Sequence, residues 1–548
     1  MKINFNTISF VWLLCTALMV SCSKREKVPL EGLTENIVFD KTDSIGANAD
    51  LFLNNIYSHL PNGFNRIGDA FLDAATDDAI SSLRNSDIEI LGRGMQSPTL
   101  TIDEAFSENY TGIRKVNLFL SKIDVVPVTD AVKGYFKAEA RFLRAMFYFE
   151  LVKRYGGVPL IGDQVLDLDS DLKTPRATFD QCVQYIVNEC DAISPLLRKE
   201  PLATNFVGRA TEGAALTLKS RILLYAASPL NNPNNDPAKW QSAMDAAKAV
   251  MDLGYYALLG NFMNLFLQRS NTEIILAYQS ARSQVIEADN APPGYSNTNA
   301  SAGLMSPTQE LVDAFPMRNG RAINDPTSGY DPDAPYTDRD QRLTFTIFYN
   351  GSRWLGRNVE TFTGGMDMPG GLITTSRTGY YLRKFMGNFA EAANYTIQDH
   401  NFIIFRYAEI LLNYAEAANE LGFTDIAYTQ LKAIRARVGI TAGAGNMYGL
   451  KTGMTREEMR EAIMLERRLE LAFEEHRFWD ARRWKKAETW FNKTLHGVKI
   501  TRLSETEFQY TPIEAGYVAF KAPQMYWYPF NFREVQRNTG LTQNPGWQ

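Results

Sequence analysis

Histidine is scarce in this sequence, and several familiar catalytic patterns are missing. The 548 residues include four histidines, and none of them forms the His-Glu-x-x-His spacing of a zinc protease helix. No Gly-x-Ser-x-Gly segment marks a hydrolase nucleophile. The formal net charge is −5, so the chain lacks the basic excess that nucleic-acid binding requires. The sequence therefore predicts no metal site, no cofactor, no catalytic residue and no nucleic-acid partner.

Cysteine is equally rare, with four residues in the whole chain. Cys182 and Cys190 lie eight residues apart within one predicted helix. At about 1.5 Å of rise per residue they would be ~12 Å apart, beyond the ~4.4–6.8 Å that a disulfide spans. We therefore predict two free, buried thiols.

Long hydrophobic runs are also lacking, apart from 13 residues at Ile8–Val20. This run is shorter than the ~20 residues of a transmembrane helix and suits a signal peptide, predicted over residues 1–21. Leu18–Cys22 resembles a bacterial lipobox, although Met19 stands where leucine is usual. We expect Cys22 to be acylated and to tether the mature chain, residues 22–548, to a membrane. An ordinary cleaved signal peptide is the alternative.

Helical patterns dominate the rest of the chain, and several have recognisable ends. Asp236-Pro237 and Gly254 delimit one helix. Three capping boxes are predicted, at Thr101/Glu104, Thr178/Gln181 and Thr455/Glu458. The predicted helices span residues 47–60, 103–123, 129–155, 178–198, 209–227, 237–253, 407–421, 424–437 and 455–490.

Two pairs of these helices resemble tetratricopeptide repeats. In the pair at 407–437, joined at Gly422, the inward positions are predicted to be Leu411, Ala415, Ala418, Ala427, Leu431 and Ile434. The small residues allow two backbones to approach closely. The second pair combines 209–227 with 237–253. We predict a mainly α fold, with a helical scaffold over about 40–255 and 400–490.

Residues 255–400 differ in composition, being rich in glycine, proline, asparagine and aromatic residues. β-prone runs such as Leu343–Tyr349 lie between turn signals. We expect loops and short strands mounted on the helical frame, which is where binding residues concentrate. The C-terminal segment, about 491–548, is also predicted to be irregular.

The helix predicted at 455–490 is densely charged. Its charged positions include Glu466, Arg467, Arg468, Glu470, Glu474, Arg477 and Asp480. Such a pattern is typical of solvated i,i+4 ion pairs. The aromatic residues Phe473, Phe478, Trp479 and Trp484 are expected to pack against neighbouring helices.

Five segments together resemble the SusD/RagB family. They are 138–160, 208–233, 406–422, 465–484 and 527–547. The resemblance implies a lipid-anchored protein of the outer membrane, exposed at the cell surface and not catalytic. It also implies binding of glycans and their delivery to a SusC-like TonB-dependent transporter. Some branches bind peptides instead.

A sugar site needs aromatic rings for the apolar ring faces and planar polar groups for the hydroxyls. Tyr349, Asn350, Arg353 and Trp354 offer both within six residues. Weaker candidates in the same insertion are Tyr295 and Tyr380. In the family, ligand contacts often follow the segment that here contains Asp77, Asp78, Arg84 and Asn85.

The predicted function is therefore capture of an oligosaccharide for a transporter. Two other classes stay open. One is a peptide-binding uptake protein of the RagB type, or a repeat-type interaction module. The other is a surface glycoside hydrolase, which would need two carboxylates ~5–9.5 Å apart. None of the 62 acidic residues is singled out for that role.

Overall fold

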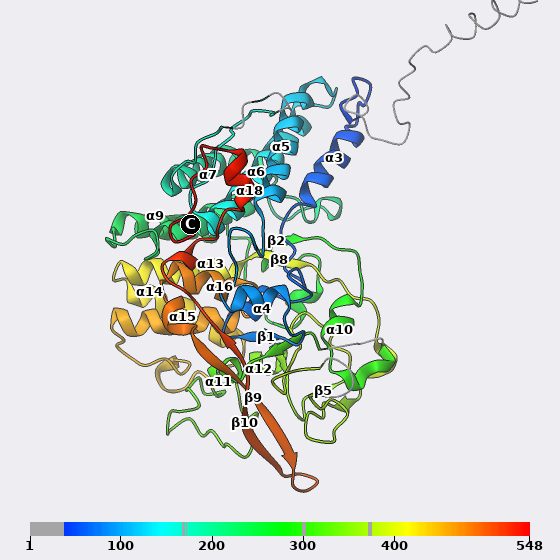
Figure 1. Ribbon diagram of the computed structural model, residues 1–548, viewed down its shortest axis with the longest axis vertical. Coiled ribbons are helices and arrows are strands. Elements are labelled where there is room, and N and C mark those ends of the chain that lie inside the picture. Colours follow the sequence, from blue (N-terminus) through cyan, green and yellow to red (C-terminus); the bar gives the residue numbers. More distant parts are fainter. Residues whose placement is uncertain (1–37, 167–169, 171–172, 299–302, 371–374, 548) are drawn as a thin grey trace, which may run out of the picture.

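The computed structural model describes residues 38–547, apart from 167–169, 171–172, 299–302 and 371–374. The predicted signal peptide and Cys22 lie outside the described residues. Helices fill the upper and left parts of the molecule, and a long β-hairpin forms its lower end (Figure 1). No helix within the described ranges combines the length and the apolar character needed to cross a membrane.

The first half of the scaffold is a series of helices in which each packs against the next in the chain. After α3 (Ala47–Tyr57) and the short α4 (Asp87–Gly92), these are α5 (Phe106–Lys122), α6 (Asp130–Tyr155), α7 (Phe179–Ile193), α8 (Glu212–Ala227) and α9 (Pro237–Asp252). The predicted capping box of Thr178 and Gln181 is confirmed, and Asp236 accepts the backbone N–H of Ala238. The box at Thr101 is wrong, because Ala105 precedes α5 and Glu104 accepts the N–H of Phe106 instead.

The second half continues the series without a break in space. Helix α9 packs against α13 (Tyr407–Glu420), which in turn packs against α14 (Thr424–Arg437) and α15 (Arg456–Glu470). All six inward positions predicted for the 407–437 pair are buried. The predicted box of Thr455 and Glu458 begins α15. The mainly helical fold is therefore confirmed. Both Cys182 and Cys190 are free and buried, as predicted.

The insertion between α9 and α13 contains short elements rather than a continuous sheet. Four antiparallel pairs join β1 (Ala79–Ser81) to β3 (Met305–Pro307), β2 (Ile274–Tyr278) to β8 (Phe402–Arg406), β4 (Ile347–Phe348) to β7 (Tyr381–Leu382), and β5 (Arg353–Trp354) to β6 (Arg357–Asn358). Its short helices are α10 (Val285–Asn290), α11 (Gln309–Ala314) and α12 (Gln341–Thr346). The β-prone run at 343–349 is thus half helical, because the Asp340 side chain caps α12.

The prediction of an irregular C-terminal segment is wrong for residues 493–518. These form an antiparallel hairpin of β9 (Lys493–Arg502) and β10 (Phe508–Val518), with a bulge between Glu514 and Gly516. Glycines and Pro512 inside the two runs weaken the strand pattern in the sequence. Gly497 is needed where it lies, since a Cβ there would be 2.4 Å from the Thr378 Cα. Short helix α18 (Phe532–Arg537) follows near the chain end.

The long charged helix predicted at 455–490 is also wrong. It is divided into α15, α16 (His476–Arg483) and α17 (Ala487–Trp490), with Phe473 and Glu475 in the left-handed backbone region. Six of the seven charged positions named for it are buried rather than solvated. The buried members are Glu466, Arg467, Glu470, Glu474, Arg477 and Asp480. Helical periodicity reveals a charged face, but it does not reveal which distant cations cover that face.

Those cations come from the insertion and from α14. Arg342 pairs with Asp340, Glu466 and Glu470, at 2.7, 2.7 and 3.1 Å, and all four side chains are fully buried. Arg406, at the end of β8, donates to Glu470 and Glu474 of the same cluster. Burying charges is tolerable only when they are paired this closely. The cluster therefore fixes the insertion to the helical scaffold.

Candidate ligand-binding groove

A groove of about 560 Å³ lies where the β9–β10 hairpin meets two loops of the insertion. The loops span residues 333–337 and 349–362. Five aromatic side chains line this groove, namely Tyr336, Tyr349, Phe362, Phe508 and Tyr510, and each of them is half-buried. We call it the hairpin groove. Half-burial anchors a ring while leaving part of it open, which suits stacking against a ligand.

Packing among the aromatic residues holds the groove in shape. The Tyr336 and Tyr349 rings stack with centroids 4.3 Å apart, and Tyr510 meets Tyr336 edge-on at 5.8 Å. The Tyr336 hydroxyl is 3.2 Å from that of Tyr380, which donates to Gln309 Oε1 at 2.7 Å. Burial raises the pKa of Tyr336 well above its ordinary value. The phenol therefore stays neutral in alkaline solution as well as at neutral pH.

Polar side chains form the rim. Arg502, at the end of β9, lies 5.4 Å from the Phe362 ring centroid, and its Nε donates to the Ser504 carbonyl. Asn358 and Thr506 are exposed at the same rim. Asn350 is buried, and its Oδ1 accepts the N–H of Thr361 at 3.2 Å. The groove thus combines aromatic surface with amide, guanidinium and hydroxyl groups.

The structure separates the predicted site residues into different places. Tyr349 and Asn350 line the hairpin groove, and Tyr380 supports it from beneath through Tyr336. Arg353 is 66% exposed and lies 3.8 Å from Glu391, outside the groove lining.

Trp354 and Tyr295 belong to the core, in contrast to the expected open stacking surface. Trp354 is 1% exposed and Tyr295 4% exposed. The Trp354 Nε1 donates to the Gly387 carbonyl at 3.0 Å, and the Tyr295 hydroxyl donates to the Trp354 carbonyl. Their rings pack together at 4.9 Å. No face of Trp354 is open to a ligand in this structure.

Asp77 and Asp78 are also buried, in ion pairs that tie the N-terminal segment to the scaffold. Arg477 holds Asp77 through two hydrogen bonds of 2.9 and 3.0 Å, and Arg468 donates to Asp78 at 2.7 Å. Because arginine engages both oxygens of Asp77 and Oδ1 of Asp78, these carboxylates serve structure. Arg84 and Asn85 are exposed on the turn after β1, apart from the groove lining.

Asp73 lies close to this cluster and is fully buried, with its Oδ1 accepting the N–H of Phe473. Burial, followed by the charges of Asp78 and Glu475, raises its pKa to about 8. The ordinary value in the unfolded chain is about 4. The protonated carboxyl therefore stabilises the folded state at low pH, and this contribution is lost as the pH rises from about 4 to 8.

We predict that Asp73→Asn gains stability relative to the unmodified protein as the pH rises. The difference in the free energy of unfolding should grow by about 1 kcal/mol between pH 6 and pH 7, since asparagine cannot lose a proton. Urea unfolding at several pH values measures it. Parallel pH profiles for the two proteins would contradict the assignment.

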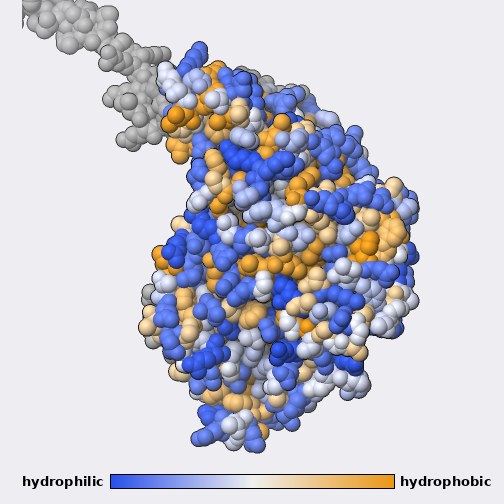
Figure 2. Space-filling model, turned by 180° about the vertical axis from the view of Figure 1, so that it is seen from behind, coloured by the Kyte–Doolittle hydropathy of each residue, from blue (hydrophilic) through white to orange (hydrophobic). Residues whose placement is uncertain are grey.

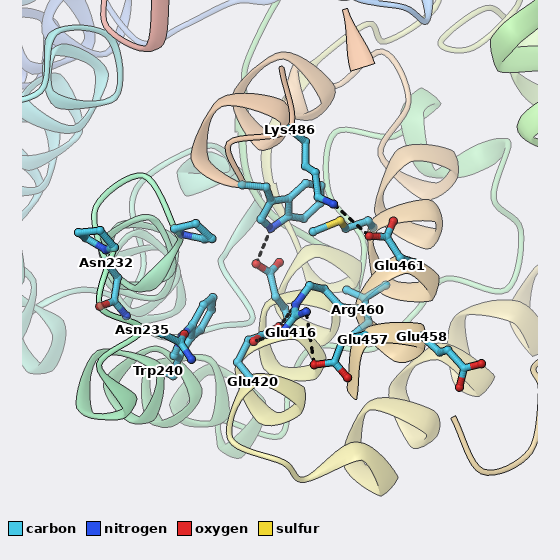
Figure 3. Close-up of a pocket in the computed structure, with 15 residues that line it drawn as sticks. Asn232, Asn235, Trp240, Glu416, Glu420, Glu457, Glu458, Arg460, Glu461 and Lys486 are labelled. Atoms are coloured by element: carbon cyan, nitrogen blue, oxygen red, sulfur yellow. Dashed lines mark hydrogen bonds and ion pairs between the residues drawn. The ribbon is translucent and has the colours of Figure 1, made fainter. Parts of the chain in front are cut away.

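A larger pocket, of about 670 Å³, lies among the scaffold helices. We call it the helical pocket. Figure 3 shows Glu416 and Glu420 of α13 and Glu457, Arg460 and Glu461 of α15 facing a space beside Trp240.

Its charged groups are already engaged with one another. Glu420 accepts from Arg460 at 2.6 Å, Glu461 lies 3.2 Å from Lys486, and Glu416 binds both Arg483 and the indole N–H of Trp484. Trp240 and Trp484 are 3% and 5% exposed. With its rings covered and its carboxylates paired, this pocket offers less to a saccharide than the hairpin groove.

Most residues of the hairpin groove could not be predicted from the sequence. Tyr336, Phe362, Arg502, Phe508 and Tyr510 were not predicted as site residues. Three of them belong to the hairpin, whose segment was expected to be irregular. A signal was present, because Phe508 and Tyr510 are two residues apart, and in a strand such residues share one face.

Comparison with known proteins places this architecture in a family. Residues 272–547 match the model of the SusD family, and residues 48–224 match a SusD-like model described as starch-binding associating with outer membrane. The chain belongs to the SusD family.

Individual relatives agree with this placement. SusD-like protein P25 of Formosa agariphila is 23% identical over 470 residues, covering 78% of this chain and 81% of that protein. A SusD-like protein of Bacteroides fragilis NCTC 9343 is 28% identical, with a TM-score of 0.78 over 92% of this chain and 98% of that chain. A SusD-like carbohydrate binding protein from the same strain has a TM-score of 0.74 at 24% identity, covering 91% and 99% of the two chains.

Proposed function

We propose that this protein is a non-catalytic glycan-binding lipoprotein of the outer membrane. It holds an oligosaccharide in the hairpin groove and delivers it to a TonB-dependent transporter of the SusC type. Acylation of Cys22 would anchor it, with the described body exposed at the cell surface.

The proposal rests on one observation, namely that half-buried aromatic rings and polar side chains line the same groove. Pyranose rings present apolar CH faces that stack on aromatic side chains, while their hydroxyls seek planar polar partners. The hairpin groove supplies Tyr510 and Phe508 for the first need, and Asn358 and Arg502 for the second. Family membership supports the same function, since one matching model is described as starch-binding and one structural relative as carbohydrate-binding.

Replacement of Tyr510 by alanine is expected to weaken glycan binding about tenfold, which corresponds to ~1.4 kcal/mol for one lost stacking surface. The measurement is affinity electrophoresis of a form beginning after Cys22, through gels containing individual polysaccharides. Isothermal titration with oligosaccharides of the retarding polymer then gives the affinity. Release of reducing sugar is assayed in parallel.

Tyr517→Ala is the matched control, because Tyr517 lies on the same strand, is 49% exposed and does not line the groove. Equal losses of glycan affinity in the two variants would contradict the hairpin groove as the binding site. Sugar release would show a hydrolase, and displacement by peptides but not by sugars would show a peptide-binding protein.

A further inference from the structure

The hairpin groove carries four charged side chains that form no ion pair within the described part of the chain. Asp333, Glu360, Glu505 and Arg502 all line it. Among the ion pairs of the described residues, none includes any of these four. Among the described residues, the Glu360 carboxylate accepts one hydrogen bond, from the backbone N–H of Met366 at 3.3 Å. The formal charge facing the groove is therefore −2.

The helical pocket shows how different this is from an acidic surface that is internally balanced. There, Glu416, Glu420 and Glu461 each have a cation at hand, from Arg483, Arg460 and Lys486. In the hairpin groove, the carboxylates can interact with a bound ligand. Their field acts on a ligand within a Debye length, ~8 Å at physiological salt.

Such a groove distinguishes ligands of the same shape by their charge. A uronic acid or sulfate group would meet carboxylates of like sign, which disfavours binding. A protonated amine would be attracted to the same carboxylates. It would also find the aromatic rings favourable, because the faces of Tyr and Phe attract cations.

We propose that the hairpin groove selects saccharides by charge. It accepts neutral sugars, binds amine-bearing sugars more tightly and excludes sugars that carry carboxylate or sulfate groups. This inference rests on the proposed function, and it names the class of glycan that the groove takes.

The test uses the chain from residue 23 onward and an oligosaccharide array in which each backbone is present in neutral, amino-sugar and uronic-acid forms. Among the backbones that bind, the amino form is expected to bind at least threefold more tightly than the neutral form. The uronic form should bind at least tenfold more weakly. Both differences should shrink between 20 and 300 mM salt, because exposed charges are screened.

Variants of the groove residues provide a second test of charge selection. Asp333→Asn, Glu360→Gln and Glu505→Gln together change the formal charge of the groove from −2 to +1. The ratio of the uronic to the neutral dissociation constant, measured within this variant, is expected to fall about tenfold. Glu461→Gln in the helical pocket is the control, and should leave the ratio as it is. If the triple variant does not fold, Glu505→Gln alone, at the exposed hairpin tip, should lower the ratio about twofold.

The outcomes separate the two claims. Binding of acidic glycans as tight as that of their neutral forms, or an unchanged ratio in the folded variants, overturns charge selection while leaving glycan binding intact. Absence of binding to every backbone, whatever its charge, overturns the proposed function and the inference with it.

Discussion

Replacement of Arg406 by methionine is expected to lower the free energy of unfolding by about 3–5 kcal/mol, because it removes the cation that three buried carboxylates share. The Arg406 side chain is 2% exposed. It donates to Glu273 at 2.8 Å, to Glu470 at 2.7 Å and to Glu474 at 2.7 Å. Methionine fills much of the space but offers no positive charge.

Urea unfolding of the soluble form measures this loss, with Arg353→Met as the matched control. Arg353 is exposed, and its only ion pair among the described residues is the 3.8 Å contact with Glu391. Exposed pairs of this kind contribute about 0–1 kcal/mol. Similar effects of the two substitutions would show that the buried cluster contributes little beyond its volume.

Trp354→Ala is expected to destabilise the protein by about 3–5 kcal/mol, the usual cost of removing a large aromatic side chain from a packed core. The indole is 1% exposed and contacts the rings of Tyr295 and Phe348, at 4.9 and 5.3 Å. Its hydrogen bond to the Gly387 carbonyl would also be lost.

Thermal unfolding and glycan titration of the same variant distinguish a core role from a ligand contact. The melting temperature should fall, while the fraction that remains folded binds glycan as the unmodified protein does. Trp354→Phe should be less destabilising, since it keeps an aromatic ring in the core. Loss of glycan binding at an unchanged melting temperature would instead show that Trp354 contacts the ligand.

Features encoded by neighbouring residues could be predicted from the sequence. The 424–437 helix has the predicted bounds, and the capping boxes at Thr178 and Thr455 begin α7 and α15. Such signals need only three or four consecutive positions. The inward positions of the 407–437 pair could also be predicted, because small and apolar residues recur there at helical spacing.

Features that depend on distant partners could not be predicted in this way. The charges of 455–490 look like a solvated face until Arg342 and Arg406 are brought against them. Trp354 looks like a sugar platform until Tyr295 and Phe348 cover it. In the hairpin groove, Tyr349 and Asn350 were found within one segment, whereas Tyr336 and Tyr510 join them from elsewhere in the chain.

The rear surface of the molecule also combines hydrophilic and apolar residues. Hydrophilic residues cover most of it, and apolar areas lie between them (Figure 2). Exposed apolar residues are a normal part of a protein surface, and composition alone does not tell which of them contact a ligand. The groove was recognisable only once its rings and its rim were placed together.

The meeting of α9 with α13 has a consequence for how the chain folds. Residues 253–406 separate the two helices, and the Asp77–Arg477 pair joins positions 400 residues apart. Closing loops of this size costs chain entropy before any contact compensates for it. Helices α5 to α9 contact their sequence neighbours and can assemble first, but one face of α9 then stays uncovered until α13 arrives. Chains arrested at that stage expose apolar surface and are prone to aggregate, so we expect slower folding of the insertion to lower the yield of folded protein.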